Sequence, residues 1–180
     1  MHSDIDKVLI DEGVIQKRLI VLADKLSQDF EGKPMVVVAL LKGAIPFMAD
    51  LLRRVPLPME IECLNVASYH GGTESSGEVT FLDRELPRVS GKAVLLLDDI
   101  LDTGRTLDAV MGKLVGEGAA EVKTCVLLAK DIEREVVTQA DYTGFVIGDE
   151  FVVGYGLDYQ GRYRNLPYVA ILKESVIEQE

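Results

Sequence analysis

The segment Ala93–Thr106, AVLLLDDILDTGRT, constrains the fold of this chain more than any other. Five consecutive apolar residues, Ala93–Leu97, are typical of a strand that is buried on both faces, as in a parallel sheet. Two aspartates follow at once, and the next turn, Thr103–Thr106, leads into a helical pattern. In open parallel sheets, ligands bind beyond the carboxyl ends of the strands. The segment therefore predicts a buried strand with a binding site at its end.

Further apolar runs alternate with helical patterns along the chain. We expect buried strands at 35–41 and 122–129, further strands or alternating patterns at 5–10, 59–67, 142–153 and 168–172, and helices at 11–30, 44–54 and after residue 106. This alternation favours an α/β fold with a central, mainly parallel sheet flanked by helices. The 180 residues contain no fixed repeat and no linker, so we expect residues 1–180 to form a single domain.

Composition argues against several classes of protein. The formal net charge of −11 disfavours a general nucleic-acid-binding surface, although local donors or a divalent cation could still hold a small anion. No apolar run approaches the roughly 18 residues of a membrane span, and the N-terminus lacks a secretory signal pattern, so we expect a cytoplasmic protein. Cys63 and Cys125 lie in apolar runs, which is typical of buried free thiols, and the two histidines offer no zinc-ligand spacing.

The turn after the first strand carries groups suited to a phosphorylated sugar. Thr103–Thr106 offers consecutive amides, two hydroxyls and a helix start, although it is not the Walker pattern of nucleoside triphosphatases. Asp98 and Asp99 could bind sugar hydroxyls or Mg²⁺. Asp102 stands between these acids and the turn, where it could accept a proton. Each acid is also compatible with a solvated loop position.

Other predicted strands end in similar chemistry. Lys42-Gly43 follows the strand at 35–41 and could hold an anion at a helix start, or be a plain strand-to-helix connection. Residues 68–78 are rich in glycine and serine and predict a surface loop, either a lid or an ordinary hairpin tip. Lys130 and Asp158 follow later apolar runs. Because these groups stand at successive strand ends, we expect them to share one crevice.

VLLLDDILDTGRT resembles the phosphoribosyl-diphosphate signature of the type I phosphoribosyltransferases: an apolar run, two acids, two apolar residues, and then a Thr-Gly-x-Thr turn. More specifically, the chain is similar to the bacterial hypoxanthine-guanine phosphoribosyltransferase family. The resemblance is carried by LLKGAIPF around Lys42, by Ser68-Tyr69, by Lys130, and by FVVGYGLDYQGRYRNLPYV at 151–169. These segments follow the family order at family-like spacings over nearly the whole chain.

The resemblance implies a fold, a reaction and partners. The fold would be that of the type I phosphoribosyltransferases, with a small hood contributed by the N-terminal residues and residues 140–180. The reaction would be a purine salvage step: transfer of the 5-phosphoribosyl group from phosphoribosyl diphosphate to N9 of hypoxanthine, and of guanine, giving IMP or GMP and pyrophosphate. The cofactor would be Mg²⁺, and the protein a homodimer or homotetramer without nucleic-acid or membrane partners.

The resemblance also implies the residues that hold ribose and phosphate. Asp98 and Asp99 would engage the ribose hydroxyls and the magnesium ion bound to them, and Asp102 would be the general base at purine N7. The turn from Asp102 onward would hold the 5′-phosphate. The full set implied for ribose and phosphate is Asp98, Asp99, Ile100, Leu101, Asp102, Thr103, Gly104, Arg105 and Thr106.

For pyrophosphate, the resemblance implies Lys42 and Gly43, in the family after a cis peptide bond, together with Arg164. Asp158 would help to hold a second magnesium ion near the pyrophosphate and also border the purine. Magnesium ions and a few basic groups could then neutralise the charge of the leaving group.

For the purine, the resemblance implies Lys130 as donor to the 6-oxo group, Phe151 as the stacking ring and Val152 as a source of backbone contacts. A lysine ammonium has donors and no acceptor, so it would select a 6-oxopurine over adenine. Ser68-Tyr69 and the loop after them would form a lid that keeps water from the reacting ribose.

Two departures from the family pattern leave alternatives open. Asp98 stands where many relatives have glutamate, which could shift the magnesium geometry, and residues 131–135 (DIERE) differ from the usual pattern. An enzyme of the same fold that prefers xanthine or guanine is therefore an alternative. An RNA-binding regulator of this fold is another, but such proteins are expected to carry an uncharged or aromatic residue in place of Asp102, and a basic face.

Overall fold

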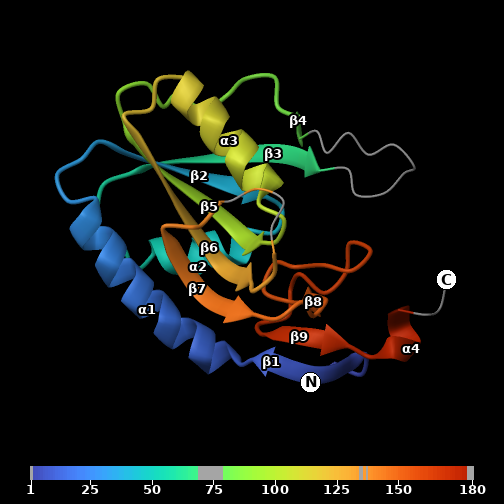
Figure 1. Ribbon diagram of the computed structural model, residues 1–180. Coiled ribbons are helices and arrows are strands. Elements are labelled where there is room, and N and C mark those ends of the chain that lie inside the picture. The colour runs from blue at the N-terminus through green and yellow to red at the C-terminus, as the bar shows by residue number, and fades with distance from the viewer. Residues whose placement is uncertain (1, 69–78, 134–135, 137, 178–180) are drawn as a thin grey trace.

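The computed structural model describes residues 2–68, 79–133, 136 and 138–177, which form two sheets with helices around the larger one (Figure 1). The strands are β1 (Ile5–Ile10), β2 (Met35–Leu41), β3 (Glu60–Ser68), β4 (Val79–Phe81), β5 (Ala93–Leu101), β6 (Glu121–Lys130), β7 (Tyr142–Ile147), β8 (Val152–Val153) and β9 (Val169–Leu172). The helices are α1 (Glu12–Asp29), α2 (Ile45–Leu52), α3 (Arg105–Gly116) and α4 (Glu174–Ile177).

The larger sheet has the strand order β4-β3-β2-β5-β6-β7. All neighbouring pairs in it are parallel except β3 with β4, which is antiparallel. From β2 the chain winds outward to β3, and from β5 it winds in the opposite direction to β6 and β7. The order therefore reverses between β2 and β5, and in open α/β sheets such a reversal is where ligands bind.

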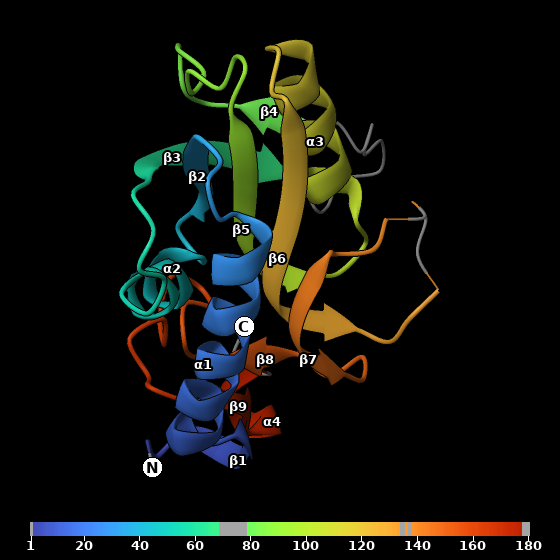
Figure 2. The same cartoon turned by 90° about the vertical axis from the view of Figure 1, so that its left-hand side faces the viewer.

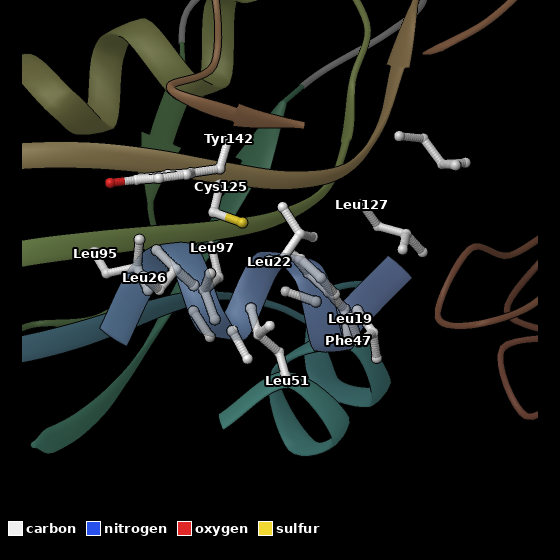
Figure 3. Close-up of a cluster of buried hydrophobic side chains, with 14 of the residues drawn as sticks. Leu19, Leu22, Leu26, Phe47, Leu51, Leu95, Leu97, Cys125, Leu127 and Tyr142 are labelled. Atoms are coloured by element: carbon white, nitrogen blue, oxygen red, sulfur yellow. The ribbon is translucent and has the colours of Figure 1, made fainter. Parts of the chain in front are cut away.

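Helices cover both faces of the larger sheet, as Figure 2 shows for α1 and α2 on one side and α3 on the other. Leu19, Leu22 and Leu26 of α1 meet Leu97 and Cys125 of the sheet in one buried cluster (Figure 3). The apolar run of β5 is buried on both faces because alternate side chains enter the two opposite clusters. The predicted α/β layering is confirmed.

The predicted first helix begins as its sequence indicates. The carboxylate of Asp11 accepts a hydrogen bond from the Gly13 amide at 2.8 Å, which caps α1. Ile15, Leu19 and Leu26 are fully buried along one stripe. Asp98 and Asp99, however, lie within β5, which continues to Leu101 instead of ending at Leu97, and Asp102 follows it directly.

A smaller antiparallel sheet, β1-β9-β8, joins the two ends of the chain. Its strands lie beyond the carboxyl ends of β5, β6 and β7 (Figure 1). β8 immediately follows Phe151, so this sheet positions part of the segment 151–169. The segment 142–153 thus splits into two strands in different sheets. The division into a single domain with a hood stays a prediction.

Two further observations concern the sequence expectations. Cys125 is buried as expected, but Cys63 is exposed. Ile61, on the same side of β3, is also 53% exposed, so no helix of the described residues covers this part of the sheet face. Among the described residues, no helix is long and apolar enough to cross a membrane.

Candidate functional site

The site lies where β2 and β5 part. Their pairing ends at Ala39 opposite Leu97, whereas β5 stays paired with β6 as far as Leu101 opposite Ala129. The last four residues of β5, 98–101, therefore have a strand neighbour on one side only within the parallel core. The acids of the sequence signature stand at this opening, at the reversal of strand order.

Two cavities meet at the opening. The first has a volume of about 340 Å³ and brings together Asp102, Lys130, Phe151, Val152 and Asp158. The second has about 240 Å³ and brings together Lys42, Gly43, Asp98, Thr106 and Arg164. Asp99 and Ile100 line both. Residues predicted from four separate segments of the chain are thus neighbours in space.

Asp98 and Asp99 form a pair of carboxyl groups that are costly to ionise together. Both keep part of their surface exposed, yet the surrounding protein desolvates them and raises the pKa of each. The charge of Asp99 adds to the effect on Asp98, whose pKa lies well above its ordinary value. The amides of Asp99 and Ile100 donate to the preceding carboxylate, each at 2.9 Å. The pair is therefore held in place, and a cation beside it would stabilise its charged form.

This donor set fits a magnesium ion. Carboxylate oxygens are the ligands that Mg²⁺ prefers, and it is usually bound through one or two carboxylates together with substrate phosphates. Among the described residues, no group of three or more His, Cys, Asp or Glu side chains forms a metal site. The Asp98–Asp99 pair thus fits a magnesium ion that is shared with an oxygen-rich substrate.

The Lys42-Gly43 turn packs against this pair. The peptide bond between Leu41 and Lys42 is cis, as the family resemblance implies. Gly43 is buried, and a side-chain carbon there would overlap the Asp99 carboxylate. Lys42 is exposed beside the second cavity. Because the Asp99 carboxylate fills the space of a side chain at this position, a larger residue there would have to displace it.

Arg164 is tied to the segment that carries Asp158. Its guanidinium pairs with the Asp158 carboxylate at 2.6 Å and donates to the Gly156 carbonyl at 2.6 Å. The other carboxylate oxygen of Asp158 accepts from the Gly161 amide at 2.8 Å. Asp158 and Arg164 consequently stand side by side, with Asp158 in the first cavity and Arg164 in the second.

The predicted phosphate turn runs from the end of β5 into α3. Gly104 has φ = 84°, a left-handed conformation that suits glycine, and stands immediately before the helix. Leu101 is only 3% exposed and belongs to the core on the α3 side, so it could offer a ligand its backbone alone. Thr103, Arg105 and Thr106 keep part of their surface exposed.

Lys130 and Asp102 stand together in the first cavity, with the ammonium nitrogen 3.5 Å from a carboxylate oxygen. Lys130 also donates to Asp149 at 3.1 Å. Burial lowers the pKa of Lys130, but its contacts with Asp149 and Asp102 outweigh that effect and raise it on balance. Lys130 is thus held as a charged donor beside an acceptor. Phe151 is 52% exposed and contacts Tyr159 edge to face.

Some predicted and some unpredicted residues complete the picture. Ser68 ends β3, and Tyr69 with the rest of the predicted lid lies outside the described residues. Glu150 and Leu157 line the first cavity and Asp149 pairs with Lys130, although the sequence did not single them out. In the sequence, the one sign that these three residues belong to the site is that they are close to Phe151 and Asp158 along the chain.

Comparisons with known proteins give consistent matches. The Phosphoribosyl transferase domain family matches residues 11–160. The bifunctional protein TilS/HprT of Listeria innocua is 46% identical over 99% of this chain, and the chain spans 28% of that protein's length. Hypoxanthine-guanine phosphoribosyltransferase of Streptococcus pneumoniae is 44% identical, with 98% of each chain covered. A crystal structure of a hypoxanthine phosphoribosyltransferase from Staphylococcus aureus superposes with a TM-score of 0.92 at 43% identity, covering 98% of this chain and 96% of that one.

Replacing Gly43 with alanine should lower the free energy of unfolding by about 1–3 kcal/mol, because the added methyl group must displace the Asp99 carboxylate. Gly112→Ala is the matched control: it lies within α3 with nothing within 4 Å of the new carbon, so it should stabilise the protein by about 0.5–1 kcal/mol. Urea unfolding followed by circular dichroism measures both. Equal effects of the two changes would contradict the contact between Gly43 and Asp99.

Proposed function

We propose a function from one premise: the chain belongs to the phosphoribosyl transferase domain family. On this premise it transfers the 5-phosphoribosyl group of phosphoribosyl diphosphate to N9 of a 6-oxopurine. The purine is hypoxanthine, and guanine as a second substrate, so that the products are IMP or GMP and pyrophosphate. This makes the protein an enzyme of purine salvage.

The observation that carries the proposal is that the two cavities share Asp99 and Ile100. A nucleotide-forming reaction needs a base site and a diphosphate site with a ribose between them. In the proposed arrangement the base occupies the cavity of Lys130 and Phe151, and the diphosphate occupies that of Lys42 and Arg164. The ribose then lies over the shared residues. From there its C1′ atom can move from the pyrophosphate oxygen in one cavity toward purine N9 in the other.

In the base cavity, the Lys130–Asp102 pair matches one edge of the purine. N7 and O6 lie next to each other on that edge. With Asp102 and Lys130 3.5 Å apart, a carboxylate acceptor and an ammonium donor can face the protonated N7 and O6 together. Asp102 accepts the N7 proton as N9 bonds to C1′ and the bond from C1′ to pyrophosphate breaks. Phe151 stacks on the ring, and Val152 offers backbone groups.

In the diphosphate cavity, the leaving group carries several negative charges, which the net charge of −11 of the whole chain does not attract. Lys42, the Gly43 amide and Arg164 supply local donors. Asp98 and Asp99, with Asp158 on the other side, would hold magnesium, which supplies positive charge that neutralises the departing pyrophosphate. The amides of residues 102–106 hold the 5′-phosphate at the start of α3.

Other parts of the proposal concern the whole chain. The sheet β1-β9-β8 acts as a hood over a single domain, and Ser68-Tyr69 with the following loop acts as a lid that excludes water. We assign the protein to the cytoplasm and expect a homodimer or homotetramer. Its partners are the two substrates, without nucleic acid or membrane.

The direct test is an assay with purified protein, phosphoribosyl diphosphate and one purine at a time. IMP should form from hypoxanthine in the presence of Mg²⁺ and stop when the metal is chelated. Adenine should remain unreacted, because Lys130 would face an amine instead of an oxo group, at a cost of roughly 10⁴-fold in the specificity ratio. Comparing rates for hypoxanthine, guanine and xanthine separates the alternatives. Equal turnover of adenine would contradict the role of Lys130.

Replacing Asp102 with asparagine should lower kcat by about 10²-fold or more, since the amide cannot accept the N7 proton. IMP binding, measured by calorimetry, should persist because the phosphate turn is retained. Asp24→Asn, a change of the same kind on the exposed side of α1, should leave kcat unchanged. An Asp102→Asn variant with full activity would remove this residue as the general base.

A further inference from the structure

A tyrosine hydroxyl outside both cavities links the loop after β8 to the helices α1 and α2. Tyr155, which is 3% exposed, donates from its hydroxyl to Asp50 Oδ2 in α2 at 2.6 Å. Gln16 Nε2 in α1 donates to the same oxygen at 2.9 Å. None of these three residues lines either cavity, so no direct contact with substrate explains the arrangement.

The acceptor is held firmly. Arg54 donates to the Gln16 side-chain oxygen at 2.6 Å and to the Asp50 carbonyl, and Arg53 pairs with Asp50 Oδ1 at 2.6 Å. Burial raises the pKa of Asp50, but the hydrogen bonds from Tyr155, Gln16 and Arg53 lower it on balance. Burial and the Asp50 charge raise the pKa of Tyr155. At neutral pH a neutral phenol therefore donates to a carboxylate, the stronger kind of hydrogen bond.

Tyr155 holds a tight turn in an unusual conformation. Gly154, Tyr155 and Gly156 all have positive φ, at 94°, 49° and 106°. For a residue with a side chain, such a conformation is unfavourable and persists only where the surroundings enforce it. The Tyr155 amide donates to the Leu166 carbonyl at 2.8 Å, and the hydroxyl bond fixes the other end of the residue.

The next residue touches the pyrophosphate turn. A side-chain carbon on Gly156 would overlap the Gly43 carbonyl oxygen, so the two backbones are in contact. Gly156 also donates to the Arg164 carbonyl at 2.9 Å and accepts from the Arg164 guanidinium at 2.6 Å. Gly156 thus stands between the two groups of donors assigned to pyrophosphate.

These contacts close a ring. Gly43 stands just before α2, and α2 carries Asp50, which accepts the hydrogen bond from Tyr155. The residue after Tyr155 is Gly156, and its backbone contacts that of Gly43. In Figure 2 the loop after β8 passes beside α2, as this ring requires. A shift of Tyr155 would therefore move Gly156 and Arg164 relative to the Lys42-Gly43 turn.

We propose that the hydrogen bond from Tyr155 to Asp50 is a clamp that sets the separation between the Lys42-Gly43 turn and Arg164. Tyr155 and Asp50 are then positioning residues for the diphosphate of the substrate and for pyrophosphate. They act through Gly156 and touch no substrate themselves. The inference rests on the proposed function, because it assigns these residues to the diphosphate half of that site.

Tyr155→Phe tests the clamp by removing one oxygen atom. The KM for phosphoribosyl diphosphate and the Kd for magnesium pyrophosphate, measured by calorimetry without purine, should each rise about tenfold, because small misplacements of binding groups are costly. The KM for hypoxanthine at saturating phosphoribosyl diphosphate should stay within about twofold, since Lys130 and Phe151 lie in the other cavity. A merely structural role of the hydroxyl would not separate these constants.

Tyr142→Phe is the matched control. Tyr142 is 4% exposed and donates to Asp29 at 2.7 Å, so the variant also loses a partly buried hydrogen bond from a tyrosine hydroxyl to a carboxylate. It is the first residue of β7, at the end of the sheet opposite Lys130, and Figure 3 shows it against the core. The thermal stability of the Tyr142→Phe variant should fall about as much as that of Tyr155→Phe. Its KM values for phosphoribosyl diphosphate and for hypoxanthine should stay unchanged.

Variants of the acceptor keep the proposal testable if Tyr155→Phe does not fold. Asp50→Ala should reproduce the rise in KM for phosphoribosyl diphosphate, whereas Asp50→Asn retains an acceptor oxygen and should restore a value near that of the unaltered protein. Unchanged constants in both Tyr155→Phe and Asp50→Ala, or an equal rise in both KM values, would overturn the clamp alone. An unaltered protein without activity would overturn the proposed function and the clamp with it.

Discussion

The site depends on the point at which β2 stops pairing with β5. Up to Ala39 and Leu97 the two strands are hydrogen-bonded neighbours. Beyond that point β5 is paired with β6 alone. Strand order reverses at the same place, so the connections after β2 and β5 leave in opposite directions. The opening between them receives the Lys42-Gly43 turn on one side and Asp98-Asp99 on the other. The same geometry that ends the pairing brings the turn and the acids into contact.

Charge explains why an acidic protein can be suited to anionic ligands. Three basic side chains line the cavities at the opening: Lys42 and Arg164 in one and Lys130 in the other. Lys130 and Arg164 are each paired with a carboxylate, Asp102 and Asp158 respectively. The raised pKa values of Asp98 and Asp99 mark a place where positive charge would be stabilising. A divalent cation brought with the substrate is the chemically simple way to meet both requirements.

Much of this organisation could be read from local sequence patterns. The strand at Ala93–Leu97, the helix capped by Asp11 and the convergence of strand-end groups follow from periodicity, capping and the geometry of parallel sheets. The separate roles of Lys130, Phe151 and Arg164 came from the family resemblance, because no spacing of residues distinguishes a purine from other ligands.

Other features depend on tertiary contacts that no local pattern contains. β5 continues through Asp98 to Leu101 because pairing with β6 outweighs the interruption of the apolar run. Cys63 is exposed because none of the helices in the described part of the chain covers its side of β3, although its apolar neighbours suggested a buried position. Tyr155 and Asp50 are 105 residues apart in sequence, so their hydrogen bond emerges only when α2 and the loop after β8 are packed together.

In the proposed function, Asp98 and Asp99 face a metal-bound diphosphate at the opening between β2 and β5. A crystal structure with phosphoribosyl diphosphate and Mn²⁺ in place of Mg²⁺ tests it most directly, because manganese is located by its anomalous scattering. We expect an anomalous peak beside the Asp98–Asp99 pair, with the diphosphate against Lys42-Gly43 and the ribose over Ile100. A diphosphate bound elsewhere, with no metal near these carboxylates, would contradict it.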